Sequence, residues 1–105
     1  MKIFTQTILS QDERIFLKGY MPADEHFTSK SEVELITNVF NLKDKNANEI
    51  IILRNAVVKY YSSLMDDEII YNDKGEYKGR TELYWMYSTA MMSVVAVIDM
   101  FRYNN

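Results

Sequence analysis

LYWMYSTAMMSVVAVIDMF, residues 83–101, predicts one long helix that is apolar nearly all round. The segment has no glycine or proline, and Asp99 is its one charged residue. At about 100° per residue, one continuous apolar arc contains Leu83, Met86, Tyr87, Ala90, Met91, Val94, Val97, Ile98 and Phe101. The opposite side carries Trp85, Ser88, Met92, Val95 and Met100. Such a helix needs cover from its own domain, from a partner or from lipid.

Lipid is the least favoured of these three environments. The uncharged part of the segment, residues 83–98, has 16 residues, fewer than the roughly 20 that span the hydrocarbon core. Tyrosine, serine and threonine lower its hydropathy, and Asp99 would be costly to place in lipid. We therefore expect no membrane partner and a helix that is buried by protein.

Length and composition favour a single small domain. The 105 residues fit one domain, residues 1–105, with one modest core. A net charge of −3 argues against direct nucleic-acid binding, which requires a basic face. The absence of cysteine excludes disulfides and cysteine-ligated metals. The first ten residues lack a long apolar run and a cleavage site, so we expect no signal peptide and a cytoplasmic location.

The N-terminal region has two alternative interpretations. Residues 2–9 are rich in β-branched and aromatic types and predict a short strand. Ser10 and Glu13 have capping-box spacing, and Gly19 and Pro22 are typical of a helix end, so residues 11–18 predict a helix of about two turns. The alternative is a hairpin that pairs residues 2–9 with 14–21.

Two further helices are predicted from caps and apolar periodicity. Ser29/Glu32 and Ser31/Glu34 both have capping-box spacing before an amphipathic segment that ends near Asn41 or Leu42. Asn46 and Glu49 precede a segment of about five turns that reaches Met65 and should lie across the final helix.

A small hairpin is predicted over residues 69–78, because Asn72, Asp73, Lys74 and Gly75 form a typical turn sequence. Thr81 then caps the final helix. The expected fold class is mainly α, with three to four helices packed around a buried C-terminal helix and a small β hairpin. The alternative is an α+β fold in which the N-terminal strand joins the hairpin.

Acidic and aromatic side chains cluster around this hairpin and suggest a surface for a protein partner. Tyrosine gives rigid contact area and is enriched at interfaces, and carboxylates would meet a basic partner. The alternative interpretation is that these acidic residues form a solvated turn that only ends the preceding helix. The candidate partner-binding residues are Asp66, Asp67, Glu68, Tyr71, Asp73, Glu76 and Tyr77.

Arg54 is unusual because it lies within the apolar arc of its predicted helix. An unpaired buried charge is costly, so a structural ion pair with Asp99 is a hypothesis, and a local Asp99–Arg102 pair is the alternative. Trp85, Met92 and Met100 are candidates for an oligomer interface if they face outward together, and a homodimer would then cover them.

The sequence contains no recognisable catalytic, metal-binding or cofactor-binding motif. We therefore expect a non-catalytic protein-binding inhibitor, such as a toxin-neutralising immunity protein or a phage-encoded anti-defence factor, that covers a basic surface of its target. The first alternative is a homo-oligomeric structural or scaffold protein assembled through the C-terminal helix. A small enzyme that uses His26, the one histidine, is the least favoured alternative.

Overall fold

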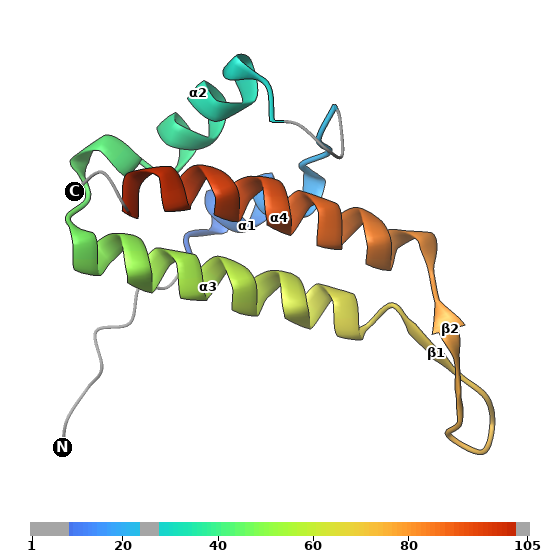
Figure 1. Ribbon diagram of the computed structural model, residues 1–105. Coiled ribbons are helices and arrows are strands. Elements are labelled where there is room, and N and C mark those ends of the chain that lie inside the picture. Colours follow the sequence, from blue (N-terminus) through green and yellow to red (C-terminus); the bar gives the residue numbers. More distant parts are fainter. Residues whose placement is uncertain (1–8, 24–27, 103–105) are drawn as a thin grey trace, which may run out of the picture.

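Two antiparallel helices form the centre of the fold (Figure 1). They are α3 (Ala47–Asp66) and α4 (Glu82–Arg102), and a hairpin of β1 (Ile69–Tyr71) and β2 (Tyr77–Arg80) connects them. α1 (Gln11–Gly19) packs against α3, and α2 (Lys30–Val39) packs against α4. The computed structural model describes residues 9–23 and 28–102. It confirms the mainly helical class, the small hairpin and the packing of α2 and α3 against the C-terminal helix.

Three helices begin at capping boxes, in which a side chain and a glutamate satisfy each other's backbone amides. The pairs are Ser10/Glu13, Ser29/Glu32 and Asn46/Glu49. Caps of this type stabilise a helix by about 1 kcal/mol each. Residues 11–19 are therefore a helix and not the second strand of a hairpin. Of the two capping boxes predicted for α2, Ser29/Glu32 and Ser31/Glu34, the first forms the N-terminus of the helix.

α2 ends earlier than predicted. Its last helical residue is Val39, whereas the periodicity predicted an end near Asn41 or Leu42. Asn41 has a left-handed backbone, with φ of 53°, which breaks the helix, and asparagine tolerates this conformation better than most residues. A short 3₁₀ helix, η1 (Leu42–Asp44), follows and buries Leu42. The apolar pattern in the sequence extends past the end of α2 because Leu42, in the turn after the helix, is buried in the core.

The core lies between the inner faces of α3 and α4 and the helices that cover them. Its fully buried members are Leu17, Ile36, Phe40, Leu42, Ile50, Leu53, Val57, Tyr61, Ala90, Val94, Val97 and Ile98. The Tyr61 hydroxyl donates a hydrogen bond of 2.7 Å to the carbonyl of Leu17, which ties α3 to α1. Burial raises the pKa of Tyr61 well above its usual range, so the hydroxyl stays protonated.

Burial along α4 is uneven. All of its fully buried residues lie between Ala90 and Ile98, where α2 covers the helix (Figure 1). Leu83, which the helical wheel placed in the buried arc, is 43 % exposed, because α2 does not reach the first turns of α4. The expected burial of this helix therefore holds for its middle, residues 90–98, whereas its first turns are more exposed.

α4 is also long and apolar enough to cross a membrane by length and composition. Its most apolar 18-residue window has a mean hydropathy of 1.3, and 28 % of that window is buried. These criteria are weak evidence for a span, since core helices of water-soluble proteins meet them too.

The hairpin extends beyond the ends of α3 and α4 (Figure 1). Ile69 pairs with Arg80, and Tyr71 pairs with Tyr77 after a bulge. The side-chain oxygen of Asn72 accepts hydrogen bonds of 2.9 Å from the amides of Lys74 and Glu76 and shapes the turn. A two-stranded hairpin is marginal by itself, so its anchoring to the helices matters for any role it has.

The predicted N-terminal strand over residues 2–9 falls almost entirely outside the described residues. Within the described part of the chain, the sheet contains β1 and β2. The α+β alternative, in which the N-terminal strand joins the hairpin, therefore stays a prediction.

Candidate protein-binding surface

The hairpin presents apolar and aromatic side chains to solvent. Ile70, Tyr71 and Tyr77 are all exposed, and the two tyrosines face each other as cross-strand partners. Their exposed fractions are 57 % for Tyr71 and 54 % for Tyr77. Large aromatic side chains that remain this exposed on a protruding element are typical of interaction sites.

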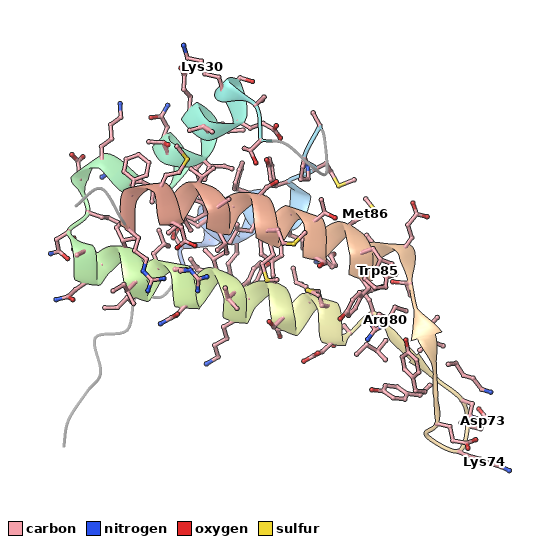
Figure 2. The ribbon with its side chains drawn as sticks, viewed as in Figure 1. Lys30, Asp73, Lys74, Arg80, Trp85 and Met86 are labelled. Atoms are coloured by element: carbon pink, nitrogen blue, oxygen red, sulfur yellow. The ribbon has the colours of Figure 1, made fainter. Side chains whose placement is uncertain are left out.

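Arg80 connects the hairpin to the first turn of α4. Its guanidinium carbon lies 5.4 Å from the ring centre of Tyr77, 4.8 Å from that of Tyr84 and 5.5 Å from that of Trp85. Figure 2 shows Arg80 next to Trp85 at the junction of β2 and α4. Cations over aromatic faces at such distances are stabilised by about 0.5–1 kcal/mol per contact at exposed sites. The three rings therefore hold both Arg80 and the base of the hairpin in place.

A second anchor for the hairpin comes from Thr81 and Glu68. The Thr81 amide donates a hydrogen bond of 3.0 Å to the Glu68 carbonyl, and its hydroxyl donates one of 2.8 Å to Glu68 Oε1. The same hydroxyl oxygen accepts from the Tyr84 amide at 3.3 Å, as expected for the helix cap. Thr81 thus joins the end of α3, the hairpin and the start of α4.

A small pocket lies beside this junction, between the end of α1 and the start of α4. Met21, Pro22, Glu82, Trp85, Met86 and Thr89 line it. Its volume of about 220 Å³ is below the roughly 300–1,000 Å³ typical of small-molecule sites. The pocket has room for a side chain or two of a partner.

The predicted acidic residues do not form one continuous patch. Asp66, Asp67 and Asp73 are exposed, the first two at the base of the hairpin and Asp73 at its tip (Figure 2). Glu68 accepts the Thr81 hydroxyl, and Glu76 accepts a hydrogen bond of 2.8 Å from the Asn72 side chain. Both glutamates therefore take part in the structure of the hairpin itself.

The hairpin also carries the cations Lys74, Lys78 and Arg80. Lys74 and Lys78 offset Asp73 and Glu76 in the outer part of the hairpin, whereas at its base three acids, Asp66, Asp67 and Glu68, outnumber Arg80. Net negative charge is therefore concentrated at the base, where α3 ends. A basic partner would be attracted most strongly there.

Arg54 and Asp99 form an ion pair between α3 and α4, with 2.8 Å between Arg54 Nε and Asp99 Oδ1. Arg102 Nη1 lies 3.9 Å from the same carboxylate oxygen, so the local pairing is present as well. The side chains of Arg54 and Asp99 are 32 % and 25 % exposed. The pair is therefore partly solvated and lies at the edge of the helix interface.

The three oligomer-interface candidates on α4 all point outward. Trp85, Met92 and Met100 have exposed fractions of 55 %, 57 % and 47 %. Trp85 lies beside the hairpin (Figure 2), whereas Met92 and Met100 lie further along the helix.

Sequence reasoning missed several members of the surface, namely Met21, Ile70, Arg80, Tyr84 and Met86. For Arg80 a local signal exists, since the two cations Lys78 and Arg80 lie between Tyr77 and the aromatic residues Tyr84 and Trp85 of the next helix. Met21 carries no such signal, because only the tertiary arrangement brings it next to Trp85.

Among the described residues, no group of three or more His, Cys, Asp or Glu side chains is arranged to hold a metal ion. His26 lies outside the described residues. Comparisons with protein families, with curated proteins and with solved structures find no match to this chain. The case for a function therefore rests on the geometry of the chain itself.

Proposed function

We propose that this chain is a non-catalytic protein-binding inhibitor that covers a basic surface of its target with the hairpin and the first turn of α4. A toxin-neutralising immunity protein or a phage-encoded anti-defence factor would be an inhibitor of this kind. The observation that carries the proposal is an exposed aromatic surface in which Tyr77 and Trp85 lie around Arg80 and Tyr71 pairs with Tyr77 on the neighbouring strand.

The composition of this surface supports binding to protein. Tyrosine, tryptophan and arginine supply most of the residues that dominate binding energy at protein interfaces. Here the rings and the guanidinium are already packed together, so less side-chain entropy is lost when a partner binds. The adjacent pocket at Met21 and Met86 offers a place for one partner side chain.

The charge distribution supports a basic target. Asp66 and Asp67 are exposed at the base of the hairpin, beside the aromatic surface. Complementary charge at the edge of an interface mainly raises the association rate, and salt weakens this effect. The aromatic centre would then determine how slowly the complex dissociates.

The test is a kinetic comparison of variants with a partner captured from the native host. Asp66→Lys/Asp67→Lys should slow association by about tenfold at low salt and flatten its salt dependence. Tyr77→Ala should instead speed dissociation by about 30-fold, the effect of losing roughly 2 kcal/mol at an interface.

Matched controls lie on α1, away from the hairpin. Asp12→Lys reverses an exposed acid there, and Ile15→Ala truncates an exposed apolar side chain. Both controls should leave the two rates unchanged. Equal effects of the α1 and the hairpin variants, or no effect of either, would remove the hairpin from the proposed binding surface.

A further inference from the structure

The outward face of the α3–α4 pair is largely apolar and is separate from the hairpin. On α4, spacings of three and four residues place one stripe of side chains opposite the buried arc: Trp85, Ser88, Met92, Val95 and Asp99. On α3, a comparable stripe contains Ile51, Arg54, Val58, Ser62 and Met65. The Arg54–Asp99 ion pair joins the two stripes, so both lie on the same side of the helix pair.

Among the described residues, side chains on this face are exposed or half-buried along both helices. Met92 is 57 % exposed, and Ile51 on α3 is exposed as well. Val58 and Val95 are half-buried between them. Figure 1 shows α3 and α4 lying side by side along their length, with α1 behind them. The face is thus a long apolar surface with an ion pair at one end.

We propose that a second copy of this chain packs on this face, so that α3 and α4 of the two copies form a four-helix assembly. The Arg54–Asp99 pair selects this occupant. A two-fold rotation about an axis parallel to the helices places α3 of one copy opposite α4 of the other, with the same ends together, so each Arg54 guanidinium can approach the Asp99 carboxylate of the other chain. A lipid surface would take both partly solvated charges into hydrocarbon without new partners.

The dimensions of the face suit such a dimer. α3 has 20 residues and α4 has 21, which gives helices of about 30 Å, and two adjacent helices are about 20 Å wide. The face therefore has on the order of 600 Å² in projection, and its accessible area is larger. Stable interfaces bury about 800 Å² per partner. Nearly the whole face would have to be covered, which the alignment of two stripes along the helices allows.

The assembly goes beyond the proposed inhibitor function and does not depend on it. Both hairpins extend past the helix ends and stay outside the paired faces (Figure 1). Trp85 borders both surfaces, so the test uses Met92, which lies two turns further along α4 and does not line the pocket.

The experiment is light scattering coupled to gel filtration on the full chain, over a wide dilution series. The expected mass at high protein concentration is twice that of one chain, and it should fall towards one chain on dilution. Met92→Glu should stay a monomer at every concentration, with an unchanged circular dichroism spectrum, because the side chain is exposed in a single copy. Ile15→Glu, an equally exposed position on α1, should dimerise like the wild type.

Three outcomes would overturn the proposal. The first is a wild-type chain that is a monomer at all concentrations. The second is a Met92→Glu variant that still dimerises. The third is a monomer that sediments with phosphatidylcholine vesicles through this face, which would show that lipid covers it. Tyr77→Ala should leave the dimer intact, so failure of the hairpin proposal and failure of this one are distinguishable.

Discussion

A hydrogen-bond cluster around Glu32 links α1 to α2. The Tyr20 hydroxyl donates a bond of 2.8 Å to Glu32 Oε2, and the Ala23 amide donates to the same oxygen at 3.2 Å. The Ser29 amide donates to Oε1 at 3.1 Å. These bonds, that from Tyr20 first, lower the pKa of the Glu32 carboxyl below its ordinary value of 4.5.

This lowered pKa predicts how stability changes in acid. At a pH between the folded and the unfolded pKa of Glu32, the unfolded chain binds more protons, so the free energy of unfolding falls as the pH falls. The contribution is fully present above about pH 4.5 and is lost as the pH drops through the folded pKa. We expect Glu32→Gln to be less stable than the wild type near neutral pH, with a difference that shrinks in acid.

Urea unfolding over a pH series measures this effect. Glu34→Gln is the matched control, because Glu34 is exposed on the same helix. Its stability should follow the wild-type pH curve. A Glu32→Gln curve parallel to that of the wild type down to the acid end would contradict the linkage.

At the scale of single residues, sequence reasoning was accurate where partners are close in the chain. The glutamate of a capping box is three residues from the cap residue, so the contact between Glu32 and Ser29 could be predicted from their spacing. Tyr20, which bonds to the same carboxylate, is 12 residues away in another element. No local pattern predicts that contact.

The hairpin is the element whose position matters most for the proposed function. Arg80 holds it against α4 through the rings of Tyr84 and Trp85. Thr81 holds it against the end of α3 through Glu68. Because the hairpin is anchored in this way, it holds Tyr71 and Tyr77 in a defined position relative to the helices.

We expect Arg80→Gln to loosen the hairpin without unfolding the protein. The change removes the cation over three rings, each contact being worth about 0.5–1 kcal/mol. Amide exchange in β1 and β2 should therefore become faster, whereas exchange in the core of α3 should change little. Lys78→Gln, an exposed cation on the same strand, is the control and should leave both rates unchanged. Equal protection of the strands in the Arg80→Gln and Lys78→Gln variants would contradict this anchoring role.

The sequence predicted the first residues of the helices more accurately than their last residues. Caps define where α1, α2 and α3 begin, because the signal lies within four residues. The end of α2 was misplaced, because the left-handed Asn41 interrupts an apolar period that continues to Leu42. The turn at Asn72–Gly75 was correct, since glycine and asparagine there have a direct conformational role.

At the scale of the whole molecule, the sequence predicted that the C-terminal helix is buried but not which part of it the other helices cover. A helical wheel places both Leu83 and Val94 in the apolar arc, yet Leu83 is 43 % exposed and Val94 is fully buried. The open first half of α4, the pocket beside Met21 and the ring cluster around Arg80 all depend on how the elements are arranged. They could be found only once the helices had been placed relative to one another.

Binding of a protein partner by the hairpin and the first turn of α4 can be measured by hydrogen exchange of the chain, alone and in complex with the captured partner. If the hairpin contacts the partner, exchange in the complex should be slower over residues 69–80 and 82–86, with α1 unchanged. Protection confined to α1 and α2, with the hairpin exchanging as fast as in the free chain, would contradict it.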